Sequence, residues 1–343
     1  SFLGELSSTG IRKLFLEKAR LDWVVAFHPT VKAFLNVDHP FCIFLVNKEE
    51  KTHEYRCVDG VTSVRGLEYT IRRSPPIRKS LIDKFAPETK ALVAARTRLE
   101  ICILEKLHRF PPLGEMVEGS WNARPYRDLD ETNDRQLLTT RQTTCRFLKG
   151  RAVFPFLIKS DRLTHWVRED LYASRDLYSR ESRVVWRDVT RPNMARRMYV
   201  TVCPPDYAVG NSLNCLVPNQ SKTEKRFLTA VMNSLVFEYR ARQISRNSHM
   251  NMFVIRQIPV PRLQEGNAFF DSIVAETETI LNNETISDEE REAVQARIDA
   301  LVAKVYGLTT EELEGILGTY TRVASSYKES VLREFNEGMR NHD

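Results

Sequence analysis

Residues 183–218 read RVVWRDVTRPNMARRMYVTVCPPDYAVGNSLNCLVP, and this stretch decides the expected fold. Residues 184–186 and 198–203 are rich in β-branched, aromatic and other apolar side chains, which favours strands, and 213–217 forms a third such run. Five arginines interrupt the pattern, at positions 183, 187, 191, 196 and 197. Strands that alternate with arginine-bearing turns suit a surface that contacts phosphates and base edges. An ordinary α+β domain with solvated arginines is the alternative that composition leaves open.

The residues before this stretch predict a small α/β region and a connector. Residues 9–19 predict a helix, 21–27 and 41–47 predict buried strands, and 52–58 predicts a strand that forms a hairpin with 41–47. An apolar stripe at helical spacing then predicts a connector helix, and its members are Leu92, Ala95, Leu99, Ile103, Leu104 and Leu107. Pro111 and Pro112 end that helix.

The residues after the stretch are mainly helical. We expect one amphipathic helix over 225–243, a strand over 253–258, and helices over 268–281, 288–305, 310–317 and 325–339. Gly307 suits a C-terminal helix cap, and the Thr-Thr-Glu-Glu sequence at 309–312 suits the start of the next helix. The carboxylates of this region contain no catalytic pair, so we expect a structural helical bundle.

Charge is distributed unevenly along the chain of 343 residues, whose net charge is +6. Residues 141–261 carry 21 Lys and Arg against 9 Asp and Glu, whereas 262–343 carry 8 against 17. A basic middle indicates a polyanionic partner such as nucleic acid. Attraction between the basic middle and the acidic end is the simpler alternative.

Composition excludes several classes of protein. Hydrophobic residues make up 42% and charged residues 28%, as in soluble globular proteins. No apolar run approaches the ~20 residues that a membrane helix needs, and we expect no membrane partner. Six scattered cysteines without a Cys-x-x-Cys pair indicate a reduced, cytoplasmic protein with no zinc site.

Five short motifs resemble the target-recognition region and helical tail of Type IIG-like and BREX-type adenine-N6 DNA methyltransferases, which serve restriction–modification or phage defence. The motifs occur in the order that this family shows: Trp186-Arg187-Asp188, Arg196-Arg197-Met198, Gly210-Asn211-Ser212, Met232-Asn233-Ser234 running to Ile258-Pro259-Val260-Pro261, and Ile298-Asp299-Ala300-Leu301-Val302-Ala303 with Tyr306-Gly307-Leu308. Each motif alone is moderately specific, and the ordered series is more so.

The resemblance implies a mixed α+β chain with four parts. Residues 1–60 would be the last strands of a Rossmann-like methyltransferase sheet, and 61–110 a helical connector. Residues 111–262 would form an α+β target-recognition domain that gives DNA specificity, and 263–343 a C-terminal helical domain. The partner implied is double-stranded DNA.

Two motifs of the resembled enzymes are missing here. No Gly-x-Gly loop follows a strand to hold S-adenosylmethionine, and none of the three Pro-Pro pairs belongs to an Asn-Pro-Pro-aromatic motif. We therefore expect a C-terminal fragment that binds no cofactor and has no catalytic or metal-binding residue. The intact enzyme would use S-adenosylmethionine, and its catalytic half would precede this chain.

Seven residues are candidates for the DNA site. The resemblance places an aromatic at Phe34 over the flipped adenine, and a core residue is the alternative for this ring. Arginine and asparagine have bidentate options to guanine and adenine, so the remaining candidates for DNA contact are Arg187, Arg191, Arg196, Arg197, Arg246 and Asn247.

Two other functions stay open on the sequence. A nucleic-acid-binding adaptor without a methyltransferase half would carry the same basic middle. An endonuclease is the third option, but no Pro-Asp…Asp/Glu-x-Lys cluster is present.

Overall fold

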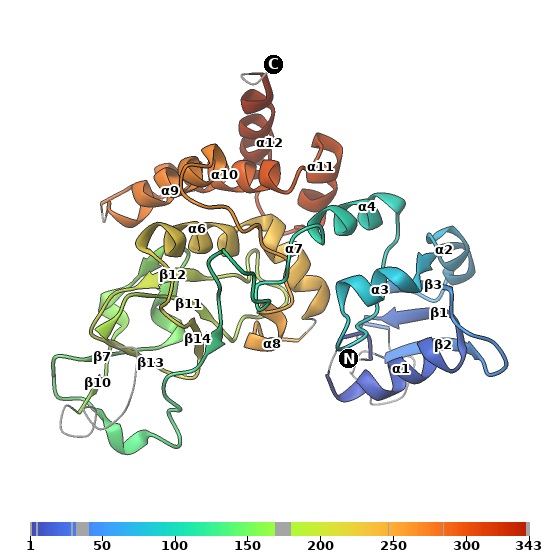
Figure 1. The fold of residues 1–343 in the computed structure, drawn as a ribbon, viewed down its shortest axis with the longest axis horizontal. Coiled ribbons are helices and arrows are strands. Elements are labelled where there is room, and N and C mark those ends of the chain that lie inside the picture. The colour runs from blue at the N-terminus through green and yellow to red at the C-terminus, as the bar shows by residue number, and fades with distance from the viewer. Residues whose placement is uncertain are drawn as a thin grey trace. The chain divides into compact units, whose positions relative to one another are not determined.

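The computed structural model describes residues 2–4, 6–28, 30–31, 41–168, 180–245, 247–283 and 285–340. The chain divides into two compact units, Ser1–Arg109 and Phe110–Asp343, which we call the N-terminal and C-terminal units. The fold is mixed α+β, as the sequence predicts: small sheets occur in both units, and the last helices pack together (Figure 1).

The N-terminal unit holds one sheet with the strand order β2-β1-β3-β4. Strand β1 pairs antiparallel with β2 and parallel with β3. The elements of this unit are η1 (Leu6–Ser8), α1 (Thr9–Glu17), β1 (Arg20–Phe27), β2 (Phe41–Asn47), β3 (Glu54–Val61), α2 (Leu67–Arg73), β4 (Ile77–Arg78), α3 (Lys79–Phe85) and α4 (Arg98–Leu107).

The predicted hairpin between residues 41–47 and 52–58 is wrong. Both runs are strands, but β1 lies between them. Leu21, Val24 and Val25 of β1 are fully buried, so this strand takes the centre of the sheet and pairs along both edges.

The predicted connector helix is wrong over its first half. Residues 92–95 form no helix: Leu92 N donates to Leu3 O (2.7 Å) and Ala95 N to Cys57 O (3.0 Å). These contacts bury the apolar residues of the stripe without a helix. Helix α4 begins only at Arg98, where the Thr97 side chain accepts a hydrogen bond from the Glu100 amide.

The C-terminal unit contains two four-stranded sheets and one hairpin among its described residues. The sheet orders are β13-β7-β10-β6 and β12-β11-β14-β5, and β8 pairs with β9. Its strands are β5 (Pro125–Tyr126), β6 (Leu138–Thr139), β7 (Arg146–Leu148), β8 (Val153–Phe154), β9 (Leu157–Ile158), β10 (Trp166–Val167), β11 (Arg183–Arg187), β12 (Val200–Cys203), β13 (Tyr207–Val209) and β14 (Leu213–Leu216), with the 3-10 helices η2 (Arg135–Leu137), η3 (Gly150–Ala152) and η4 (Ser160–Arg162).

The three apolar runs of the arginine-rich stretch are confirmed as strands. They become β11, β12 and β14, and β11 lies between the other two with antiparallel pairing on both sides.

Helix α6 packs against strands β11 and β12 with one face and against the C-terminal helices α9 and α10 with the other (Figure 1). The four C-terminal helices lie where the sequence predicts them, with capping boxes at the start of two of them. The helices of this unit are α6 (Lys222–Asn233), α7 (Leu235–Ile244), α8 (Met252–Ile255), α9 (Ala268–Leu281), α10 (Asp288–Val305), α11 (Thr310–Gly318) and α12 (Ser325–Arg340).

Two expectations for residues 225–258 are corrected. The single helix over 225–243 is two helices, because Ser234 leaves the helical conformation and its side chain caps α7. The expected strand over 253–258 begins instead as helix α8, which the Asn251 side chain caps.

Within the described residues, no helix has the length and apolar character needed to cross a membrane.

Candidate nucleic-acid interface

The first arginine of the stretch, Arg183, belongs to the core. Its side chain is fully buried and forms an ion pair with Asp128, whose side chain is also fully buried, at 2.5 Å. Its Nη2 also donates to Tyr207 O at 2.8 Å. A charge that is buried and paired in this way serves the packing of the sheet.

Arg196 is also held inside the C-terminal unit. Its Nη1 donates to Asn233 O (2.9 Å), and its Nη2 lies 2.6 Å from both Asp299 Oδ2 and Tyr327 OH. Its side chain is 14% exposed. The DNA contact predicted for Arg196 is therefore not supported by this geometry.

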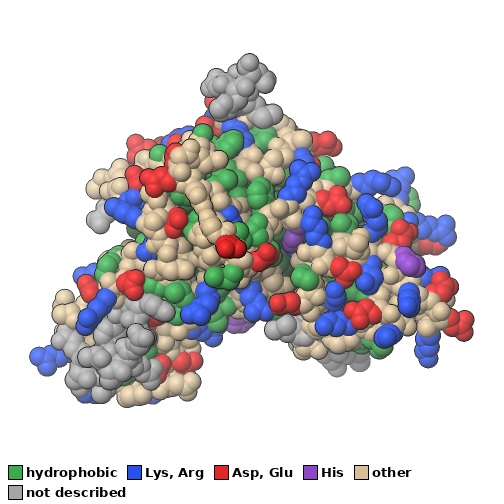
Figure 2. All heavy atoms as spheres, in the orientation of Figure 1, with side chains coloured by type: hydrophobic (Ala, Val, Ile, Leu, Met, Phe, Trp, Pro, Cys, Tyr) green, Lys and Arg blue, Asp and Glu red, His purple; other side chains and the backbone are tan. Residues whose placement is uncertain are grey.

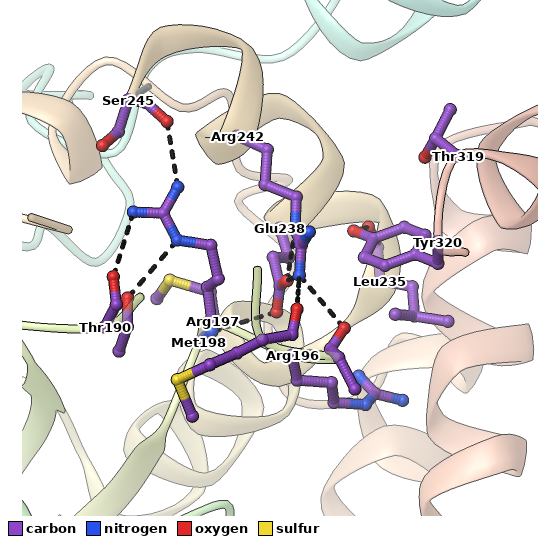
Figure 3. A network of polar contacts seen from close by, with 12 residues as sticks. Thr190, Arg196, Arg197, Met198, Leu235, Glu238, Arg242, Ser245, Thr319 and Tyr320 are labelled. Carbon is purple, nitrogen blue, oxygen red and sulfur yellow. Dashed lines mark hydrogen bonds and ion pairs between the residues drawn. The ribbon is translucent and has the colours of Figure 1, made fainter. Parts of the chain in front are cut away.

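Arg197 is 2% exposed and points toward Thr190 and Ser245, as Figure 3 shows. Its Nη1 donates to Ser245 O (3.0 Å) and its Nη2 to Asn247 O (2.5 Å). Burial lowers the pKa of this guanidinium to about 10, which still leaves it charged at neutral pH. Arg197 thus fixes the backbone of two loops, and its predicted DNA contact has no geometric support either.

A buried acid completes the network in Figure 3. Glu238 is fully buried, accepts a hydrogen bond from Met198 N (2.9 Å) and pairs with Arg242 at 2.6 Å. Arg242 in turn donates to the carbonyl oxygens of Met194 and Ala195 (2.9 and 3.0 Å). The segment that carries Arg191 is thereby anchored to helix α7.

Two of the predicted stretches meet beyond the end of β11. Val189 and His249 form an antiparallel bridge, Thr190 N donates to Ser248 O (2.8 Å), and Met250 N donates to Asp188 O (2.7 Å). We call residues 188–191 and 247–250 the loop pair. The structure thus brings together the Arg191 and Asn247 segments, which are 56 positions apart in the sequence.

The outer residues of the loop pair face solvent. Arg191 and Asn247 are both exposed, and neither the Arg191 guanidinium nor the Asn247 Nδ2 has a hydrogen-bond partner among the described residues. Beside them lies a shallow depression of about 860 Å³ that is lined by Val189, Thr190, Arg191, Asn193, Met194, Ala195 and Arg322. The Arg191 guanidinium and the Asn247 Nδ2 are therefore accessible to a ligand at this surface.

Asn247 keeps its orientation through its own side chain. Its Oδ1 accepts a hydrogen bond from His249 N at 2.9 Å and from Ser245 Oγ at 3.3 Å. His249 faces Asp188, with 3.6 Å between Nδ1 and Oδ2, and Asp188 is paired with Arg127 at 2.8 Å. Contacts within the protein therefore hold the Asn247 side chain and the Asp188 carboxylate in place.

Arg187 lies at the end of β11 and is half-buried. Its guanidinium stacks 4.3 Å from the ring centroid of Tyr199 and 4.8 Å from that of Phe154, and its Nε donates to Val153 O at 2.6 Å. Burial lowers the pKa of Arg187, with the nearby Arg162 as a weaker cause, while Tyr199 acts in the opposite direction.

Phe34 and Arg246 lie outside the described residues. Of the remaining candidates, Arg187, Arg191 and Asn247 have side-chain nitrogens left for a ligand. Lys159 and Arg162, which are not among the predicted site residues, pack on the ring of Phe154. The excess of basic residues near Phe154 in the sequence is the feature from which these two residues could have been predicted.

Net charge alone does not define this surface. On the face shown in Figure 2, basic and acidic side chains are interspersed over both units. In the part of the chain that is described, no group of three or more His, Cys, Asp or Glu residues is placed to hold a metal ion.

Comparison with known proteins gives structural similarity at low identity. No family model and no curated protein matches the sequence. Among solved structures, the Type IIL restriction–modification enzyme MmeI in complex with DNA aligns over 91% of this chain and 48% of its own, with 9% identity and a TM-score of 0.46. The type IIG restriction endonuclease BpuSI aligns over 98% and 47%, with 10% identity and a TM-score of 0.43.

A chain from a type I restriction–modification system aligns over 61% of this chain and 52% of its own, with 15% identity and a TM-score of 0.31. The present chain spans about half the length of each of these structures.

Proposed function

We propose that this chain is the DNA-specificity part of a site-specific adenine-N6 DNA methyltransferase of a restriction–modification or phage-defence system. Residues 111–262 bind the duplex and select the site. The catalytic half and S-adenosylmethionine belong to the intact enzyme, and this chain supplies recognition.

The loop pair is the observation that carries the proposal. It presents Arg191 and Asn247 on its two paired segments, both exposed, and the Arg197 guanidinium donates to Asn247 O. The Arg191 guanidinium can donate two hydrogen bonds to guanine O6 and N7 in the major groove, and the Asn247 Nδ2 can donate one to an acceptor on a base edge. A side chain that hydrogen bonds hold in place, as they hold that of Asn247, suits sequence readout better than the flexible surface of a general polyanion binder.

The intact enzyme must also extract its target base, because the adenine amino group is otherwise inside the duplex. We propose that Phe34 stacks on the extruded adenine and offsets part of the lost stacking energy, about 1–3 kcal/mol by analogy with single-strand binders. Replacement of Phe34 by alanine in the intact enzyme then abolishes methylation while duplex affinity and melting temperature stay near normal. A melting temperature lowered by many degrees assigns the ring to the core instead.

Fluorescence anisotropy with a labelled 30-base-pair duplex tests the DNA-binding proposal on the chain itself. We expect weak binding at about 50 mM salt that is lost steeply toward 200 mM, because each phosphate contact releases counterions. Absence of binding at low salt, or binding that ignores salt, would overturn the proposed function.

A further inference from the structure

A second group of basic side chains surrounds Phe154. Three cationic groups lie against this ring: Lys159 Nζ at 4.9 Å from its centroid, and the guanidinium carbons of Arg162 and Arg187 at 4.8 Å each. Tyr199 lies at 6.2 Å from the same ring, edge to face. We call these five residues the Phe154 cluster.

The cations of the cluster have no carboxylate partner among the described residues. None of Lys159, Arg162 and Arg187 forms an ion pair with a carboxylate in the described residues, whereas the buried Arg183 and Arg196 each have an aspartate. Residues 146–168 contain six Lys and Arg but one acid, Asp161. Three like charges around one ring repel each other, and an anion bound between them removes that cost.

The cluster is also held rigidly. The β8–β9 hairpin that carries Phe154 is tied to the larger sheet, because Phe156 N donates to Val200 O at 2.8 Å. Stacking and the bond to Val153 O fix Arg187, and its Nη1 and Nη2 have no partner among the described residues. Lys159 and Arg162 are exposed.

This geometry suits phosphate. A stacked guanidinium with two free terminal nitrogens matches the bidentate geometry of a phosphate group, and a lysine adds a mobile point charge. Phenylalanine contributes no hydrogen bond, so the cluster has little means of reading a base edge. A chain of evenly spaced single charges, as in a nucleic-acid backbone, engages several cations at once.

We propose that the Phe154 cluster binds the phosphodiester backbone of DNA and positions the duplex, while the loop pair reads its bases. The ligand class rests on the proposed function, but the location is independent of it. Phosphate contacts fix register without carrying sequence information, so the cluster governs affinity for every sequence alike.

The double variant Lys159→Ala/Arg162→Ala tests the proposal by anisotropy on the same labelled duplex over a range of salt. Each phosphate contact contributes about 0.9 to the slope of log K against log salt, so we expect the slope to fall by about 1.8 and the affinity at least tenfold near 100 mM salt. The matched control is Lys222→Ala/Arg333→Ala, which removes two exposed charges elsewhere in the C-terminal unit and is expected to change the slope little.

A second variant separates charge from packing. Lys159→Gln/Arg162→Gln keeps aliphatic stems against the Phe154 ring, so the same loss of slope with an unchanged melting temperature supports phosphate contact. Suppose that the wild-type chain binds DNA and that the alanine and glutamine double variants of Lys159 and Arg162 keep its slope of log K against log salt. The cluster proposal is then overturned, while the proposed function stands. If the wild-type chain binds no DNA, the proposed function itself fails and takes the phosphate assignment with it.

Discussion

Arg196 and Asp299 are 103 positions apart in the sequence, yet Arg196 Nη2 lies 2.6 Å from Asp299 Oδ2. The same carboxylate accepts hydrogen bonds from Tyr327 OH (2.5 Å) and, through Oδ1, from Leu235 N (2.7 Å). One aspartate therefore joins the arginine-rich stretch to α7, α10 and α12. Arg196 is among the residues predicted to contact DNA, and this joint shows that it also holds the strands and the helical tail together.

Replacement of Arg196 by alanine should destabilise the C-terminal unit strongly. It leaves Asp299 buried with an unpaired charge, and breaking a buried pair in this way costs about 3–5 kcal/mol. Urea unfolding followed by circular dichroism measures the change. Arg191→Ala is the control, since an exposed arginine without partners should change the free energy of unfolding by less than about 0.5 kcal/mol. Equal midpoints for the two variants would contradict the structural role of Arg196.

Gly210 should not tolerate a side chain. A Cβ at this position would lie 2.6 Å from the Phe147 ring, and the backbone there is fixed because Gly210 N donates to Leu148 O at 2.9 Å. Overpacking of this kind costs about 1–3 kcal/mol. Gly210→Ala should lower the melting temperature measured by differential scanning fluorimetry, and the double variant Gly210→Ala/Phe147→Leu should recover part of the loss. Without such recovery, the steric explanation fails.

The sequence predicted well those elements whose structure is determined by residues within the element itself. Helices α9 and α10 have the predicted bounds, because apolar periodicity and capping residues such as Asn267 and Ser287 lie within the segments themselves. The predictions that failed concern segments whose structure depends on contacts with residues far away in the sequence. Residues 92–95 carry a helical apolar pattern but pair with Leu3 and Cys57, and no local signal announces those partners.

The candidate site shows the same limit. Sequence places five arginines in one stretch, but it does not tell which guanidinium meets a buried carboxylate. Asp128 and Asp299, which pair with Arg183 and Arg196, lie 55 and 103 positions away. The proximity of Arg191 and Asn247 likewise depends on the bridge between Val189 and His249, a tertiary contact.

The buried thiols of strands β12 and β14 should be inert in the folded protein. Burial raises the pKa of Cys203 to about 12, and it also raises that of Cys215, whereas Cys102 is exposed. Thiolate is the reactive species, so at pH 8 Cys203 should react about a thousandfold more slowly than an ordinary thiol. Iodoacetamide labelling read by peptide mass spectrometry should modify Cys102 first and Cys203 only after denaturation. Early labelling of Cys203 would show that the sheet containing β12 and β14 unfolds locally under native conditions.

The same raised pKa predicts a loss of stability at alkaline pH. Between about pH 9 and 12 the unfolded chain releases the Cys203 proton while the folded chain retains it, so the free energy of unfolding falls as pH rises. The slope from this group is at most about 1.4 kcal/mol per pH unit. Cys203→Ala should show a shallower decline than the wild-type protein in urea titrations over this range. Tyrosines titrate in both proteins, so identical slopes would rule out the thiol as a contributor.

Asn247→Asp offers the sharpest test of base readout by the loop pair. An aspartate retains an oxygen to accept the bonds from His249 N and Ser245 Oγ, so the loop keeps its support, but it replaces the outward Nδ2 donor by an acceptor. The donor offered to a base edge is lost, and one base pair of the selected site should lose about 1–3 kcal/mol of discrimination. Selection from a randomised duplex library measures this as a relaxed or altered preference at that position. The added negative charge weakens binding to every sequence alike, and Arg322→Ala, which removes one positive charge from the lining of the adjacent depression, gives the size of that general effect. A selected motif identical to that of the wild-type chain would remove Asn247 from the recognition surface, whatever happens to the overall affinity.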